Sequence, residues 1–184
     1  IITVDSVSVG GTVSSNATLC SGNNSGALIL SGNRGSVVKW QFSTNSGTTW
    51  TDIANINNTQ SYTNITVATQ YRAVVANGVC TSANSSAATL SVNAASVGGA
   101  VAGSTSVCTG TNSGTLTLSG QTGTIIRWEY SINGGAGWTN IVNTTASQTF
   151  SNLTQTRIYR ALVKSGVCDS AYSSTAQITV DPVS

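Results

Sequence analysis

The feature that most constrains this chain is an internal repeat with a constant offset of 88 residues. Five distinctive positions recur at that offset without a gap: Cys20 and Cys108, Trp40 and Trp128, Trp50 and Trp138, Tyr71 and Tyr159, and Cys80 and Cys168. Self-similarity at a fixed period is the signature of tandem modules. The sequence therefore predicts two copies of one module, residues 6–93 and 94–184, joined by a linker of a few residues.

The two ends of the chain also match parts of the repeat. Residues 1–5 align with residues 89–93, the predicted closing strand of a module, and residues 181–184 align with residues 93–96, where a module begins. We expect residues 1–5 to be the end strand of a preceding repeat, and the last residues to lead into a following one. The alternative, a complete two-domain protein with a spare leading strand, stays open.

Each copy contains a hairpin signature bounded by two tryptophans. The segments are W-Q-F-S-T-N-S-G-T-T-W from Trp40 to Trp50 and W-E-Y-S-I-N-G-G-A-G-W from Trp128 to Trp138. The Asn-Ser-Gly and Asn-Gly-Gly triplets predict a tight turn between a strand that carries a buried aromatic residue and a second strand that begins at the other tryptophan.

Alternation of apolar and polar residues predicts short strands throughout. No segment has the period of an amphipathic helix, so each module is expected to be a sandwich of two antiparallel sheets. A core tryptophan (Trp40, Trp128) and a tyrosine on a late strand (Tyr71, Tyr159) resemble the immunoglobulin plan. The inward positions expected in the first module are Leu28, Leu30, Val38, Trp40, Phe42, Tyr71, Ala73, Val75, Ala88, Leu90 and Val92.

One departure from the immunoglobulin plan concerns its core disulfide. In that plan a cysteine lies two residues after the tyrosine, but Ala73 and Ala161 occupy those positions here. The fold class predicted is therefore all-β, with two tandem immunoglobulin-like modules that lack this bond.

The four cysteines are predicted to form one disulfide in each module. Cys20 and Cys80 are 60 residues apart, as are Cys108 and Cys168, and such a bond would join two loops at one end of the sandwich. Disulfides indicate an oxidising compartment outside the cytoplasm. With no histidine and no Cys-x-x-Cys spacing, neither a metal site nor a cofactor is expected.

Composition argues against several classes of function. Charged residues make up 7% of the chain and the net charge is +2, so no nucleic acid partner is expected. No apolar run is long enough for membrane insertion. Catalysis is not expected either, because no histidine is present and no acid is matched by an acid in the other repeat. Glu129 is expected to form a solvated pair with Arg160 across the sheet.

The hairpin turn resembles the Asp-box of sialidases, in which Ser43 to Trp50 would form a structural turn without a catalytic role. Trp50 and Trp138 leave two alternatives open. Either ring could stack on a sugar, or it could close the edge of the core against Tyr62 or Phe150.

Three motifs occur in both copies. They are S-V-G-G-x-V followed by C-x-G-x-N-S-G-x-L-x-L-S-G, then W-x-x-S-x-N-x-G-x-x-W-T-x-I, and then Y-R-A-x-V-x-x-G-V-C. Together they resemble the repeat of giant cell-surface adhesins of Bacteroidota, including gliding-motility adhesins. The resemblance implies export by the type IX secretion system, an extracellular location on the bacterial surface, and a role in attachment or gliding.

The predicted function is a stalk or filament segment of such an adhesin, whose partners are neighbouring repeats of the same chain. A surface polysaccharide or another protein stays open as a further partner. The alternative function is a carbohydrate-binding module of a secreted multidomain enzyme.

Overall fold

The computed structural model describes residues 4–182, and all of its regular elements are β-strands. The chain divides into two compact units, Ile1–Asn93 and Ala94–Ser184, called the first and second module below. The predicted all-β class with two tandem immunoglobulin-like modules is confirmed. No helix within the described part of the chain is long and apolar enough to cross a membrane. Residues 1–3 and 183–184 of the predicted end segments lie outside the described residues, and Val4 and Asp5 are not in a strand.

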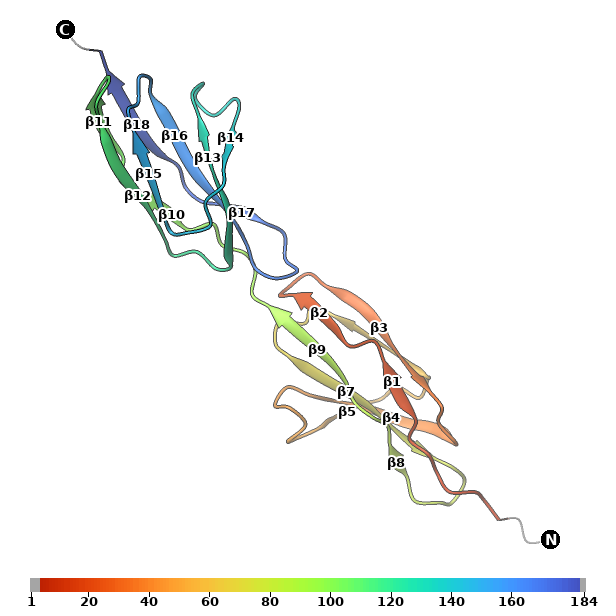
Figure 1. Ribbon diagram of the computed structural model, residues 1–184. Coiled ribbons are helices and arrows are strands. Elements are labelled where there is room, and N and C mark those ends of the chain that lie inside the picture. Colours follow the sequence, from red (N-terminus) through yellow and green to blue (C-terminus); the bar gives the residue numbers. More distant parts are fainter. Residues whose placement is uncertain (1–3, 183–184) are drawn as a thin grey trace. The chain divides into compact units, whose positions relative to one another are not determined.

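Each module is a sandwich of a three-stranded and a six-stranded sheet (Figure 1). In the first module the smaller sheet has the order β1-β3-β6 and the larger one β2-β9-β7-β4-β5, with β8 pairing to β7. The strands are β1 (Thr12–Ser14), β2 (Ala17–Cys20), β3 (Ser25–Ser31), β4 (Ser36–Ser43), β5 (Thr51–Ile53), β6 (Thr59–Thr63), β7 (Thr69–Ala76), β8 (Ala83–Asn84) and β9 (Ala88–Asn93).

The second module repeats this topology strand for strand. Its smaller sheet has the order β10-β12-β15 and its larger one β11-β18-β16-β13-β14, with β17 pairing to β16. The strands are β10 (Ala100–Ala102), β11 (Thr105–Cys108), β12 (Ser113–Ser119), β13 (Thr124–Ser131), β14 (Thr139–Ile141), β15 (Ser147–Ser151), β16 (Arg157–Lys164), β17 (Ala171–Tyr172) and β18 (Ala176–Asp181).

A core tryptophan occupies the space between the sheets of each module. Trp40 on β4 and Trp128 on β13 are fully buried, and each indole nitrogen donates a hydrogen bond to a backbone carbonyl, Asn57 at 2.8 Å and Thr145 at 2.9 Å. Tyr71 and Tyr159 are buried in the same clusters, which also contain the inward leucines of β3 and β12. The indole therefore both fills the core and satisfies a carbonyl of the loop that follows β5 or β14.

A β-bulge changes which face one predicted core position occupies. Val38 was expected to point inward with Trp40, but the register of β4 with β7 shifts between Val37 and Lys39. The extra residue reverses the alternation, so Val37 is buried and Val38 is 48% exposed. The same shift occurs between Ile125 and Arg127 in the second module.

The predicted disulfide within each module is wrong. Cys80 and Cys108 are free thiols, whereas Cys20 and Cys168 are disulfide-bonded, so neither Cys20–Cys80 nor Cys108–Cys168 is formed. The reason is the direction of β2, which pairs in parallel with the last strand of the module, β9, and ends at Cys20 beside Asn93. Figure 1 shows the arrowheads of β2 and β9 at the same end of the module, away from β8.

The distance between the two cysteine positions follows from the register. Ala17, Leu90 and Thr69 lie in one row across β2, β9 and β7. Cys20 lies three residues beyond this row, while Ala76, the last residue of β7, lies seven residues beyond it in the opposite direction. At about 3.3 Å per residue this places Cys20 and Ala76 about 30 Å apart. The four residues from Ala76 to Cys80 can span about 14 Å at most. At least about 16 Å therefore remains between Cys20 and Cys80, whereas a disulfide requires Cα atoms within about 7 Å.

Candidate functional site

The larger sheet of each module carries a polar network on its outer face, and Trp50 and Trp138 belong to this network. Trp50 precedes β5 and is half-buried, with the Arg72 guanidinium 4.1 Å from its ring centroid. It is not among the described residues that pack against the core cluster of the first module, whereas Tyr62 is. The described contact of Trp50 is thus a cation–π contact on the surface of the sheet and not closure of the core edge.

In the first module the network connects four side chains on neighbouring strands. Lys39 Nζ lies 2.7 Å from Asp52 Oδ2, and Gln41 Nε2 donates to Asp52 Oδ1 at 2.7 Å. Gln41 Oε1 in turn accepts a hydrogen bond from Arg72 Nε at 2.8 Å. The hydrogen bonds from Lys39 and then Gln41 lower the pKa of Asp52, because they stabilise its charged form.

In the second module the carboxylate of the network is not on the edge strand but at the centre of the network, on β13. Glu129, in the position of Gln41, is 2% exposed and accepts from Arg127 Nε and Arg160 Nε at 2.8 Å each. The expected pair between Glu129 and Arg160 is therefore present, but the carboxylate is buried and not solvated. The Arg160 guanidinium also lies over Trp138 at 3.7 Å and over Tyr172 at 3.6 Å.

The chemistry of these networks is structural. Each carboxylate oxygen accepts a bond from a cationic or amide donor, and one arginine of each network, Arg72 or Arg160, also covers an indole ring. Within the described residues, no group of three or more His, Cys, Asp or Glu side chains could hold a metal ion. The tryptophan suggested as a glycan contact therefore already has a guanidinium as its stacking partner in both modules.

The turn that resembles an Asp-box is held by its own side chains. Ser43 Oγ accepts a hydrogen bond from the Gly47 amide at 2.9 Å, and Asn45 Oδ1 accepts one from the Thr49 amide at 3.0 Å. Ser46 and Gly47 both have positive φ, at 57° and 83°, which explains the glycine. Ser131 and Asn133 make the equivalent bonds in the second module, to the amides of Gly135 and Gly137. Both turns are therefore fixed by side-chain to backbone bonds.

At the C-terminal end of the first module, an asparagine holds the backbone around Cys20. The Asn24 amide donates to the carbonyl of Cys20 at 2.8 Å and to that of Ile65 at 2.7 Å. Asn112 makes the same two bonds in the second module, to Cys108 and Leu153. This role was not predicted from the sequence, although the spacing Cys-x-x-x-Asn occurs in both repeats and is the signal that could have revealed it.

The other cysteine position lies at the N-terminal end of each module, beside the segment where the chain enters. Cys80 Sγ is 3.6 Å from the Asp5 carbonyl oxygen, and the Val79 amide donates to the Asp5 side chain at 3.2 Å. In the second module, Cys168 Sγ is 3.3 Å from the Ala94 carbonyl oxygen. A tight turn presents both, because Cys80 N donates to Asn77 O and Cys168 N to Ser165 O.

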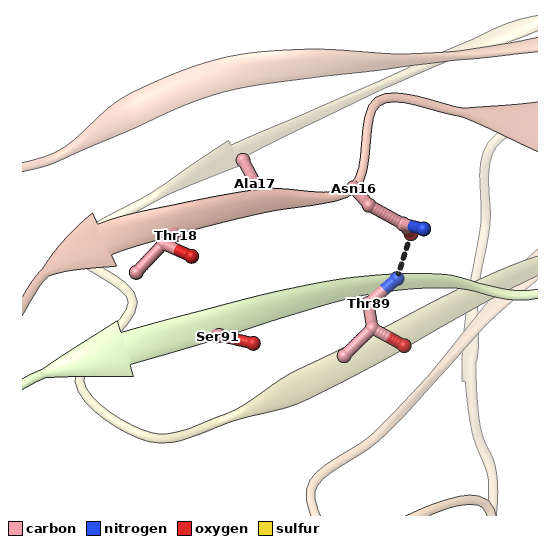
Figure 2. Close-up of a pocket in the computed structure, with 5 residues that line it drawn as sticks. All are labelled: Asn16, Ala17, Thr18, Thr89 and Ser91. Atoms are coloured by element: carbon pink, nitrogen blue, oxygen red, sulfur yellow. Dashed lines mark hydrogen bonds between the residues drawn. The ribbon is translucent and has the colours of Figure 1, made fainter.

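A hollow of about 280 Å³ lies over the parallel pair β2 and β9 (Figure 2). Asn16, Ala17, Thr18, Thr89 and Ser91 line it. Asn16 Oδ1 accepts a hydrogen bond from the Thr89 amide at 2.7 Å, which caps the start of the pair. The hollow contains no charged side chain, and its amide oxygen is used by the backbone, so it has the character of a sheet surface.

Comparison with solved structures identifies the fold. A chain from the complex of the mouse coronavirus receptor-binding domain with its murine receptor is 11% identical, with a TM-score of 0.53, covering 90% of this chain and 96% of that chain. The four N-terminal Ig domains of Dscam1 isoform 4.44 are 14% identical, with a TM-score of 0.48, covering 98% and 47%. Fibronectin(III)-like modules of Clostridium thermocellum CbhA are 15% identical, with a TM-score of 0.37, covering 93% and 94%. Only the first of these three similarities has a TM-score above 0.5, and at 11% identity it describes the fold alone.

The family is identified by the sequence. No curated protein matches the chain. A family described as a domain of unknown function, DUF8696, matches residues 9–94 and again residues 97–182. Together the two matches cover nearly the whole chain, so this protein belongs to the DUF8696 family and contains two of its domains in tandem.

Proposed function

We propose that this chain is a structural stalk or filament segment of a repetitive bacterial cell-surface adhesin that mediates surface attachment or gliding motility. The observation that carries the proposal is the direction of the chain through each module. In the first module Ser6 and Ser8 bond to Asn77 at one end of the sandwich, and Asn93 pairs with Cys20 at the other. A module that the chain enters at one end and leaves at the opposite end can be repeated to build length.

The pairing of β2 with β9 supports a mechanical role. These strands lie near the two ends of the module's chain, and they are parallel over four residue pairs, from Ala17 and Leu90 to Cys20 and Asn93. Tension on the two ends pulls them in opposite directions along their common axis. All hydrogen bonds of the pair then share the load, instead of opening one after another. The pair β11 and β18 repeats this arrangement.

An extracellular location is part of the proposal. Disulfide-bonded cysteines, here Cys20 and Cys168, persist in oxidising compartments. The resemblance to adhesin repeats adds export by the type IX secretion system and attachment to the cell surface. The partners proposed are neighbouring repeats of the same chain, with a surface polysaccharide or another protein as a further contact. No enzymatic activity is proposed for this segment.

Two measurements test the proposal. Antibodies raised against this chain should label intact cells of the source organism, and shortening the repeat array in the gene should reduce attachment or gliding. Absence of surface labelling, or normal attachment and gliding after the array is deleted, would contradict the proposal.

Binding assays separate the stalk from the alternative, a carbohydrate-binding module of a secreted enzyme. The alternative rests on one observation, that Trp50 and Trp138 are half-buried at the surface and not in the core. It predicts retention of the chain on a polysaccharide matrix, lost in W50A and W138A. The stalk proposal predicts the same elution with and without the matrix.

A further inference from the structure

We propose that Cys80 and Cys108 are attachment sites for further copies of this module. Cys108 of one chain would form a disulfide with the Cys80 of another, so that the C-terminal end of one module is joined covalently to the N-terminal end of the next copy. The proposal rests on the positions of the cysteines and does not depend on an adhesive function.

The cysteines of the two modules occupy equivalent positions. Cys108 occupies the place of Cys20, at the end of the strand that pairs in parallel with the last strand of its module. Cys80 occupies the place of Cys168, in the turn that follows β7 in the first module and β16 in the second. Each module thus has one cysteine at each of its two ends.

Distance excludes a bond within a module. Cys20 and Ala76 are about 30 Å apart, and the four residues from Ala76 to Cys80 span about 14 Å at most, so the two cysteines stay at least about 16 Å apart, more than the 7 Å that a disulfide allows between Cα atoms. The register of the second module is the same. Every cysteine of this chain can therefore bond only to a cysteine outside its own module.

The equivalent positions carry disulfide-bonded cysteines. Cys20 and Cys168 are disulfide-bonded, although neither can reach the other cysteine of its own module. Cys20 lies at the C-terminal end of its module, and Cys168 lies at the N-terminal end of its module. Cys108 and Cys80 occupy the equivalent two positions and are the free thiols, with Cys108 exposed and Cys80 partly exposed.

Both free thiols are presented by the same scaffolds as the bonded ones. Asn112 holds the Cys108 carbonyl as Asn24 holds that of Cys20. The turn bond from Cys80 N to Asn77 O, 3.0 Å, matches the one from Cys168 N to Ser165 O, 2.9 Å. A further copy of the module would therefore meet a thiol in a backbone setting that already supports a disulfide at the equivalent position.

The chemistry balances with a low-molecular-weight disulfide as oxidant. The thiolate of one cysteine attacks the oxidant, releases one small thiol and forms a mixed disulfide. The thiolate of the second cysteine then attacks the protein sulfur of that mixed disulfide, forms the bond between Cys108 and Cys80, and releases the second small thiol. Two protein thiols are oxidised and one small disulfide is reduced to two thiols.

The test uses two variants of the full chain that carry different tags. C80S retains only Cys108 as a free thiol, and C108S retains only Cys80. The variants are incubated alone and mixed, with oxidised and reduced glutathione, and separated on non-reducing gels. We expect the mixture to form a heterodimer at least about tenfold in excess of either homodimer, because only complementary ends present the thiols in a bonding geometry.

Two controls make the result decisive. C80S/C108S should remain monomeric, and adding T48C to that double variant places a single thiol on the exposed hairpin turn, which measures unspecific oxidation. Peptide mapping of wild-type multimers should show Cys80 linked to Cys108. Homodimers as abundant as the heterodimer, or a heterodimer yield no higher than the T48C control, would overturn the proposal.

Discussion

Replacing Glu129 by glutamine perturbs the most buried charge in the second module without changing its shape. The carboxylate is 2% exposed, and its oxygens lie 2.6 Å from Arg127 Nη2 and 2.8 Å from Arg160 Nη2, in addition to the two bonds from the Nε atoms. Glutamine offers one acceptor oxygen in place of two, and its amide hydrogens would face a guanidinium group. E129Q therefore leaves two arginines without their counter-charge.

The expected cost follows from the burial of the three groups. Removing one partner of a fully buried ion pair costs about 3–5 kcal/mol. The side chains of Arg127 and Arg160 retain 32% and 20% of their exposure, so water partly replaces the lost carboxylate. We expect a loss of about 2 kcal/mol in the free energy of unfolding of the second module, which lowers its Tm by about 10 °C.

The first module supplies the design of a rescue. There Gln41 occupies the place of Glu129, and the carboxylate is on Asp52, opposite Gln41 on β5. Asn140 is the residue opposite Glu129 on β14. E129Q/N140D would therefore rebuild the arrangement of the first module. Because position 140 is exposed, we expect it to recover about 1 kcal/mol.

Differential scanning calorimetry of the full chain measures both modules at once. The transition of the first module should keep its Tm in both variants and serves as the internal reference. If E129Q leaves the second transition within about 2 °C of the wild type, the buried network contributes no net stability. If E129Q/N140D is no more stable than E129Q, the equivalence of the two networks is refuted.

Three further effects can be measured by chemical denaturation. W50A should cost about 1 kcal/mol, since it removes a cation–π contact at the surface, and W138A should cost more because its arginine contacts two rings. Equal costs would argue against this stacking. N24A should cost about 1–3 kcal/mol by leaving two carbonyls without a donor, and an unchanged midpoint would show that water replaces the amide. Because the pKa of Asp52 is lowered in the folded protein, its stabilising contribution is present at neutral pH and is lost as the pH falls through its ordinary range and below; D52N should reduce this acid dependence.

The strands and the core tryptophans could be predicted because they depend on local sequence patterns, and because both copies of the repeat contain these patterns. Leu28 and Leu30 are buried and Ile29 is 51% exposed, as the exchange of Ile29 for Thr117 indicated. A substitution tolerated between two copies of one fold marks the outward face of a strand. Val38 could not be placed in this way, because a bulge changes the alternation without changing the residue types at that position.

The polar network was only partly visible in the sequence. Glu129 and Arg160 could be paired from the register of neighbouring strands, since residues opposite each other in a sheet are close. The burial of that carboxylate and the stacking of Arg160 on Trp138 could not. They depend on side chains from β16 and from the loop before β14, which converge only when the sheet forms.

The sequence by itself determined that this protein is two copies of one all-β module, because an 88-residue period and a two-residue alternation are local, repeated properties of the chain. Only the tertiary structure decided where the cysteines lie. In a perfect repeat the spacing from Cys20 to Cys80 recurs unchanged, so it cannot tell a bond within a module from a bond outside it. The parallel pairing of β2 with β9 settles the matter, since it places Cys20 at the opposite end of the sandwich from Cys80, too far for a disulfide within the module.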